Sequence, residues 1–134
     1  MATTMSVEGD VVRVAVQGRL DGEDVDTLAQ ALRERLDTGR DFGVVFDRRE
    51  LGAPTKAGRE ALERWGSADL EAMGKPCAGW ADVYDERRAA SLTRAAENRE
   101  GHEKPVYPYR MFTDIAEAHA WASEQLAARR STGS

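Results

Sequence analysis

The sequence contains few of the residues that build disulfide-bonded or metal-bound frameworks. Its 134 residues include a single cysteine, Cys77, which excludes an intrachain disulfide and a zinc site made of several cysteines. The two histidines, His102 and His119, have no further ligands that the sequence places near them, so no metal is expected. Cys77 opens an apolar stretch, and we expect a small buried side chain there and not a reactive thiolate.

Long apolar runs and an excess of positive charge are also missing. No stretch approaches the ~20 apolar residues of a membrane span, and residues 1–5 lack the charged and apolar regions of a secretory signal. The 24 acidic residues outnumber the 19 basic ones, which gives a net charge of −5. Because a basic face supplies most of the affinity for nucleic acid, a nucleic-acid partner is not expected. A cytoplasmic protein is the default expectation.

Motifs that carry chemistry are absent as well. The sequence shows no nucleophile triad and no glycine-rich phosphate loop, so no cofactor is expected and the fold is easier to infer than a reaction. The length predicts one domain over residues 1–130. The last four residues, 131–134, are small and polar and are expected to form a disordered tail.

What the sequence does contain is an alternation of short β-like apolar runs with amphipathic helical stretches. Strands are expected at residues 3–7, 11–17, 42–46, 77–84 and 106–112, with a hairpin turn at Gly9-Asp10 or a three-residue loop that includes Glu8. Helices are expected after the capping residues Asp21, Thr55, Asp85 and Asp114 (or Thr113). This order predicts an α/β domain with a single-layer mixed, mostly parallel sheet of about five strands and about four helices mainly on one face.

Two strands carry more specific expectations. Pro108 cannot donate to a ladder, so the last strand should lie at an edge or carry a bulge. Strict alternation along residues 77–84 places two sets of side chains on opposite faces: Cys77, Gly79, Ala81 and Val83 on one, and Ala78, Trp80, Asp82 and Tyr84 on the other.

Three stretches of this pattern point to a family. They are residues 14–20 followed by Glu23-Asp24, residues 44–47 followed by Leu51, and residues 109–112 followed by Glu117-Ala118 and Trp121. In their order and spacing the chain resembles the STAS-like domains, the fold of the bacterial anti-sigma-factor antagonists. It resembles most their divergent SpoIIAA-like relatives, which are also likened to lipid-binding CRAL-TRIO domains. The resemblance covers roughly residues 5–128.

The resemblance implies a candidate regulatory residue. In such antagonists a partner kinase phosphorylates a serine or threonine at a helix N-terminus after the central strand, and the added charge blocks docking. Thr55 stands at the matching place, with Gly58 after it and Pro54 where an acidic residue is usual. The residues alone also permit a plain helix cap at Thr55, which is the routine use of threonine there.

A second group of candidates lies near the carboxyl ends of the predicted strands, where open α/β sheets bind ligands. Asp47, Asp82 and Tyr84 are the candidate catalytic residues, because two carboxylates in one pocket can divide acid and base roles. Turn and capping duty for these aspartates is the alternative interpretation. The candidate ligand-binding residues are Trp80, Tyr107, Tyr109 and Arg110.

These observations favour a small STAS-like module that binds a protein partner or a small apolar ligand between sheet and helices, as a monomer or homodimer. The alternative is a small cofactor-independent enzyme, for example a cyclase, or an accessory protein of a specialised biosynthetic pathway that uses the Asp/Tyr-lined pocket. A third hypothesis is a structural or dimeric module that uses the sheet edge at Pro108. The residues leave open whether the protein is an enzyme.

Overall fold

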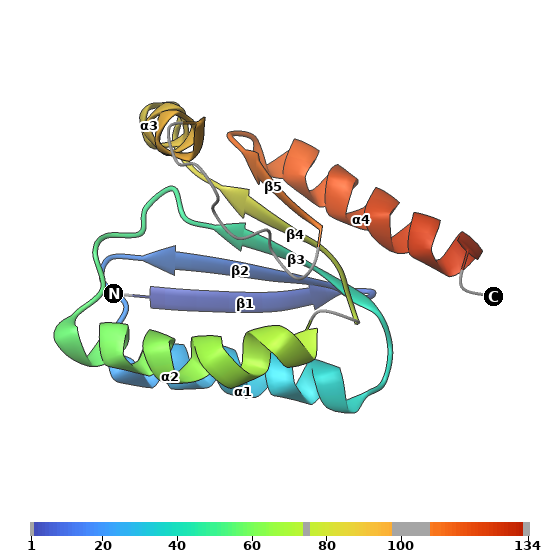
Figure 1. The fold of residues 1–134 in the computed structure, drawn as a ribbon, viewed down its shortest axis with the longest axis horizontal. Coiled ribbons are helices and arrows are strands. Elements are labelled where there is room, and N and C mark those ends of the chain that lie inside the picture. The colour runs from blue at the N-terminus through green and yellow to red at the C-terminus, as the bar shows by residue number, and fades with distance from the viewer. Residues whose placement is uncertain (1, 74–75, 98–107, 133–134) are drawn as a thin grey trace.

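The computed structural model describes residues 2–73, 76–97 and 108–132, and at residues 2–5, 65–73, 95–97 and 132 it describes the backbone alone. Five strands and four helices follow one another in the predicted order (Figure 1). The elements are β1 (Ala2–Glu8), β2 (Val11–Gln17), α1 (Gly22–Asp37), β3 (Phe42–Asp47), α2 (Lys56–Met73), β4 (Cys77–Val83), α3 (Glu86–Glu97), β5 (Tyr109–Phe112) and α4 (Ile115–Thr132).

The sheet is mixed and mostly parallel, as predicted. Its strands lie in the order β1-β2-β3-β4-β5, with β1 antiparallel to β2 and each later pair parallel. Glu8 pairs directly with Val11, so Gly9 and Asp10 form the two-residue turn of the hairpin. Gly9 has a φ of 60°, which suits the first position of a type II′ turn.

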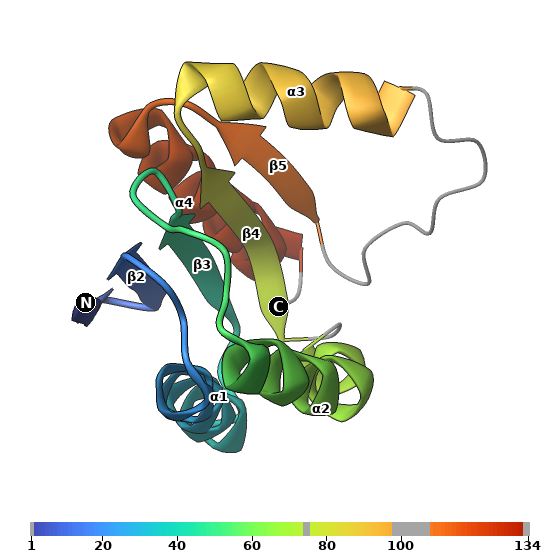
Figure 2. The same ribbon diagram turned by 90° about the vertical axis from the view of Figure 1, so that its left-hand side faces the viewer.

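The helices cover both faces of the sheet, where the sequence predicted mainly one (Figure 2). Val25, Leu28 and Leu32 of α1 and Ala61 of α2 pack on one face, against Val14, Val44, Phe46 and Trp80. Ala118, Ala122 and Leu126 of α4 pack on the other face, against Val45, Ala81, Val83 and Phe112. The reason is topological: α1 and α2 connect parallel strands and share a face by crossover handedness, whereas α4 follows the last strand and is free of that rule.

Asp21 caps the N-terminus of α1 as the sequence predicted, and a glycine ends the helix. The Asp21 side chain accepts a hydrogen bond from the amide of Asp24, and the Asp24 side chain accepts one from the amide of Asp21. This reciprocal box satisfies two amides that a helix N-terminus leaves without partners. At the other end Gly39 adopts a φ of 71° and its amide bonds to the Leu36 carbonyl, which is a left-handed helix termination.

A β-bulge in β4 overturns part of the predicted alternation. Phe42 pairs with Cys77, but the next residue, Gly43, pairs with Gly79, so Ala78 is an extra residue in the ladder. Cys77 therefore lies in the same core as Trp80, under α1 and α2, while Ala78 lies in the core under α4. The two side chains have exchanged the faces that strict alternation gave them.

The carboxyl-terminal edge of the sheet agrees with the prediction made from Pro108. β5 is the last strand of the sheet, and Pro108 directly precedes it, accepting a hydrogen bond from the Trp80 amide through its carbonyl. Figure 2 shows α3 beside this edge and apart from α1 and α2. In the described part of the chain, no helix is both long enough and apolar enough to cross a membrane.

Candidate functional site

The two candidate carboxylates lie on opposite faces of the sheet, so they do not form the predicted common pocket. Asp82 pairs with Phe46 across the β3–β4 ladder, and Asp47 pairs with Val83. Phe46 packs under α1 and α2, and Val83 packs under α4. Because Asp82 shares a face with Phe46 and Asp47 shares a face with Val83, the sheet itself separates the two carboxylates.

Asp82 is the centre of a hydrogen-bonded cluster at the carboxyl end of β4. Its Oδ1 accepts from Arg48 Nε at 2.9 Å and from Trp80 Nε1 at 2.8 Å. Its Oδ2 accepts from the Tyr109 hydroxyl at 2.5 Å. The Asp82 side chain is buried, so these three donors replace the water that a carboxylate requires. We call Arg48, Trp80, Asp82, Tyr84 and Tyr109 the Asp82 cluster.

Arg48 is the member of this cluster that the sequence prediction missed. Its guanidinium lies 4.2 Å from the centroid of the Phe46 ring and 5.9 Å from that of Tyr84, besides its ion pair with Asp82. Burial alone would lower the pKa of Arg48, but the negative charge of Asp82 raises it overall. A signal for Arg48 was present, since alternation continued past residue 46 places it on the face of Phe46 and Asp82.

The two described tyrosines of the cluster are held protonated. Burial raises the pKa of Tyr109, and the adjacent Asp82 charge raises it further. Burial also raises the pKa of Tyr84, which is hydrogen-bonded to Tyr109. Tyr107, the third predicted aromatic wall, lies outside the described residues. The cluster therefore contains neutral tyrosine hydroxyls beside an ion pair. Its one carboxylate, that of Asp82, accepts hydrogen bonds from three side chains of the protein.

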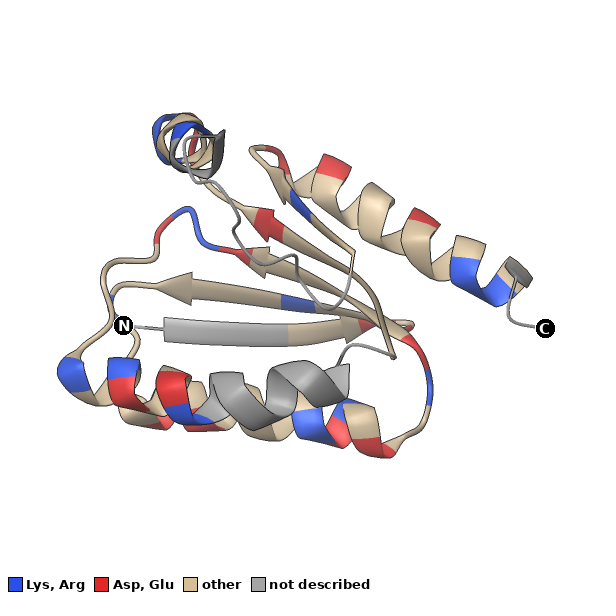
Figure 3. Ribbon diagram, viewed as in Figure 1, with Lys and Arg blue, Asp and Glu red and all other residues tan. Residues whose placement is uncertain are grey.

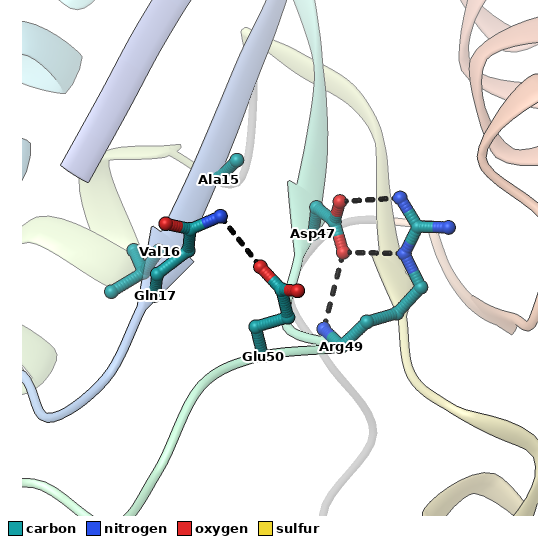
Figure 4. A pocket seen from close by; sticks show the side chains of 6 residues that line it. All are labelled: Ala15, Val16, Gln17, Asp47, Arg49 and Glu50. Atoms are coloured by element: carbon teal, nitrogen blue, oxygen red, sulfur yellow. Dashed lines mark hydrogen bonds and ion pairs between the residues drawn. The ribbon is translucent and has the colours of Figure 1, made fainter. Parts of the chain in front are cut away.

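Asp47 has a simpler environment on the other face. Arg49 binds it with two side-chain contacts, Nε at 2.9 Å and Nη2 at 2.7 Å, and the Arg49 amide donates a third bond (Figure 4). The hydrogen bond from Arg49 is the main cause that lowers the pKa of Asp47. An open pocket of about 400 Å³ lies here, lined by Ala15, Val16, Gln17, Asp47, Arg49 and Glu50. Gln17 and Glu50 are bonded to each other at 2.6 Å, so the polar groups of this pocket satisfy one another.

An apolar cavity lies on the other face, between the sheet and the helices α1 and α2. Its volume is about 60 Å³, far below the ~300 Å³ at which small-molecule sites begin. Trp80 lines it, and its ring stacks on Phe46 with 6.2 Å between centroids, so Trp80 serves as a core residue. The other lining residues are Val14, Leu20, Val25, Leu28, Leu32, Val44, Phe46, Arg48 and Leu62.

Thr55 caps α2 and also joins that helix to the segment before α1. Its hydroxyl accepts a hydrogen bond from the Gly58 amide at 3.0 Å and donates one to the Leu20 carbonyl at 3.3 Å. The Thr55 amide bonds to the same carbonyl at 2.9 Å. Gly58 fits against the Leu20 backbone so closely that a Cβ at this position would overlap the Leu20 carbonyl oxygen.

The remaining candidates do not join either site. Arg110 is exposed, with its guanidinium 5.0 Å from the Phe112 ring centroid. Burial raises the pKa of the Cys77 thiol to about 12, which fits a core side chain. His119 Nε2 lies 3.5 Å from a Glu8 carboxylate oxygen, and His102 is outside the described residues. Among described side chains, no three His, Cys, Asp or Glu residues gather as metal ligands would.

Comparison with known proteins places this geometry in a fold. No protein-family model and no curated protein sequence matches the chain. A DUF3478-family protein with a SpoIIAA-like fold from Shewanella loihica PV-4 matches it with a TM-score of 0.63 and 18% identity, over 90% of this chain and 92% of the other. The anti-sigma factor antagonist SpoIIAA in its unphosphorylated form matches with a TM-score of 0.60 and 10% identity, over 92% and 98%.

A third structure agrees with these two. An anti-sigma factor antagonist from Mycobacterium paratuberculosis matches with a TM-score of 0.54 and 18% identity, over 91% of this chain and 93% of its own. Identities this low carry information on the fold alone. The chain therefore has the SpoIIAA-like fold of STAS-like domains, in agreement with the resemblance of its sequence.

Proposed function

We propose that this chain is a regulatory module that works by binding another protein, and that the binding surface is the β3–α2 loop with the first turns of α2. The observation that carries the proposal is the set of hydrogen bonds that hold this loop, residues 48–55, to neighbouring segments. A loop held in one conformation before binding loses little conformational entropy when a partner docks.

Backbone groups along the loop are bonded to neighbouring segments. The Glu50 carbonyl accepts from the Gly18 amide at 3.0 Å, and the Gly52 amide donates to the Gly18 carbonyl at 2.7 Å. Arg19 donates to the Ala53 and Pro54 carbonyls at 3.0 and 3.2 Å, and Arg88 Nη1 donates to the Leu51 carbonyl at 2.9 Å. The β2–α1 connection and α3 thus hold this loop from two sides.

The side chains that this surface exposes suit a protein partner. Ala53 is an exposed residue of the loop. The first two turns of α2 add four more exposed residues: Lys56, Ala57, Arg59 and Glu60. The charged side chains among them can set electrostatic complementarity with a partner. The proteins with this fold that are named as anti-sigma factor antagonists suggest an anti-sigma factor as the partner class.

Binding to a protein is better supported than the other functions that the sequence allowed. The Asp82 carboxylate accepts bonds from three side chains, so it lacks the open coordination that a general base needs. The apolar cavity of about 60 Å³ would have to expand several-fold to hold an apolar ligand. The catalytic roles of Asp47, Asp82 and Tyr84 therefore have less physical support than contact with a partner.

Thr55 gives this surface a candidate control point, as the family resemblance implies. A phosphate on its hydroxyl would replace the hydrogen that is donated to Leu20 and would set its oxygens against that carbonyl. The same phosphate could accept hydrogen bonds from the backbone amides at the N-terminus of α2. We propose that phosphorylation at Thr55 changes the position of the loop and weakens partner binding.

Site-specific photocrosslinking in the source cells tests the proposed surface. A benzoylphenylalanine at position 57 should capture a protein that mass spectrometry identifies as an anti-sigma factor. The matched control is position 120, another exposed helical alanine, on α4. Equal capture at both positions, or no product at 57, would refute this surface.

Two substitutions test the control point with the partner so identified. Thr55→Glu should weaken its binding about tenfold or more, because the added charge faces the Leu20 carbonyl. Thr55→Ala should bind like the parent protein, since it adds no charge. If Thr55→Glu and Thr55→Ala bind equally well, Thr55 is a helix cap and nothing more.

A further inference from the structure

The outer edge of β5 is the edge of the sheet opposite to β1. β5 ends the sheet, and within the described residues no strand pairs with its outer side. The amides of Trp80 and Tyr84 donate to the Pro108 and Phe112 carbonyls at 2.8 and 3.0 Å. Because parallel ladders use alternate residues, the amides and carbonyls of Tyr109 and Met111 point outward.

Helix α3 stands beside this edge with very little of its surface covered. Of residues 86–94, all but Ala89 are exposed, and Leu92 keeps 38% of its surface accessible. Contacts of Arg88 hold the first turn, through the Leu51 carbonyl and a guanidinium 5.4 Å from the Tyr84 ring centroid.

A groove of about 370 Å³ separates α3 from β5. Glu86, Ala89, Ala90 and Thr93 line it from α3, at spacings of three, four and seven that define one helix face. Residues 110–113 of β5 and its end line the opposite side, and Glu117 of α4 closes the rim. Figure 3 shows acidic residues at the start of α4, next to the end of β5. Two small alanines and a threonine leave the space of the groove unfilled.

We propose that this groove binds an extended segment of a protein partner, which adds to β5 as a sixth strand beneath α3. Outward backbone groups on β5 select an extended backbone, since a helix has no free amides to offer them. The hollow at Ala89 and Thr93 takes an apolar side chain. Glu86 and Glu117, against Arg110 alone, select a basic residue in the segment.

Peptide selection followed by direct binding tests the site while the partner is still unidentified. Linear peptides displayed on phage are selected against the full chain, and the recovered sequence is synthesised with a fluorophore for anisotropy titration. Selected peptides should combine alternating apolar residues with at least one lysine or arginine. Failure to enrich any peptide would overturn the proposal.

Substitutions at Met111 separate strand addition from other modes of binding. Met111→Pro removes an outward amide that the β4–β5 ladder does not use, so an edge strand tolerates it. Met111→Ala removes the same side chain and keeps the amide. The peptide should bind to Met111→Ala within about threefold of the parent and to Met111→Pro at least about tenfold more weakly. Equal binding to both variants would exclude backbone pairing.

A second pair of variants tests the helix side and covers the case in which Met111→Pro fails to fold. Ala89→Glu places a charge in the groove, whereas Ser91→Glu places the same charge on an α3 position that does not line it. Only Ala89→Glu should weaken binding of the peptide, by about tenfold or more in affinity. Equal effects of the two would overturn the site on α3.

Hydrogen exchange measures whether the bound peptide protects the outer edge of β5. The Met111 amide should exchange rapidly in the free chain and become protected when the peptide is bound. If the free chain is instead a dimer that Met111→Pro dissociates, the edge serves a second copy and the peptide site is wrong. Position 57 lies on α2 and does not line this groove. The crosslinking experiment and the peptide experiment can therefore fail independently of each other.

Discussion

Arg48 and Asp82 are joined by a 2.9 Å contact between Nε and Oδ1, although 34 residues separate them in the sequence. The contact fixes the start of the β3–α2 loop to β4. The Asp82 side chain is 5% exposed and that of Arg48 is 28% exposed, so the pair is largely removed from water. Loss of either partner leaves a charge with little solvent to stabilise it.

Asp82→Asn should therefore destabilise the fold. The amide keeps the size of the side chain but loses the charge, and its NH₂ group faces donors that need an acceptor. We expect a loss of about 3 kcal/mol in the free energy of unfolding, measured by urea denaturation. Asp47→Asn is the matched control, since its pair with the exposed Arg49 is worth about 0–1 kcal/mol. An Asp82→Asn protein that keeps its stability would contradict this structural role and leave Asp82 available for the chemistry of the enzyme hypothesis.

The tyrosines of the Asp82 cluster predict alkaline instability. Both pKa values are raised by burial, so the folded chain keeps these protons after the unfolded chain has released them. Stability is fully present below about pH 10, the unfolded value, and falls as the pH rises above it. Unfolding midpoints in urea between pH 9 and 11 should show this fall. Tyr84→Phe should flatten the slope, and an unchanged slope would contradict the assignment.

Asp10 in the hairpin turn predicts an acid-sensitive connection between the two helix layers. Arg35 from α1 and Arg40 donate to its carboxylate at 2.9 and 2.8 Å, and Arg130 from α4 donates as well. Burial would raise the pKa of Asp10, but these arginines lower it overall. The stabilisation is present above about pH 4 and is lost as the pH falls below that.

Replacement of the Asp10 carboxylate tests this connection. Asp10→Asn should lower the free energy of unfolding by about 2 kcal/mol at pH 7, because it removes the negative charge that faces three arginines and replaces one acceptor oxygen with an NH₂ group. The difference in stability between the parent and the variant should shrink steadily as the pH falls below about 4. A constant difference across this pH range would show that the loss arises from packing and not from charge.

Gly58 predicts a reversal of the usual effect of alanine in a helix. Replacement of an exposed glycine in a helix by alanine usually stabilises the protein by about 1 kcal/mol. At position 58 the new Cβ would overlap the Leu20 carbonyl oxygen, so Gly58→Ala should cost about 2 kcal/mol in thermal or urea unfolding. Gly22→Ala is the control, because its Cβ would lie 3.5 Å from the Ala57 carbonyl oxygen, an ordinary contact. Equal stability of the two variants would mean that the helices can move apart.

Local chemistry explains which parts of the fold the sequence could predict. Asp21 and Thr55 act through hydrogen bonds to amides three residues further along the chain. The hairpin turn at Gly9 is local in the same sense, and Pro108 acts through the amide that it lacks. These features were predicted correctly because no distant part of the chain can change them.

The features that the sequence could not predict depend on contacts between distant segments. The bulge at Ala78 is set by how β4 aligns with β3, which the alternation of residues 77–84 does not contain. The face that α4 covers is likewise chosen by small residues, Ala118 and Ala122, which carry little amphipathic signal. The separation of Asp47 from Asp82 follows from the register in which β3 pairs with β4.

The strand order has a consequence for how the protein is made. Spatial order and sequence order coincide from β1 to β5, so each strand leaves the ribosome directly after the neighbour with which it pairs. The sheet can grow by one strand at a time without waiting for a later segment to fill a gap. Helix α4 is synthesised after all five strands, so the face carrying Val45, Ala81 and Val83 is covered only once the sheet is complete.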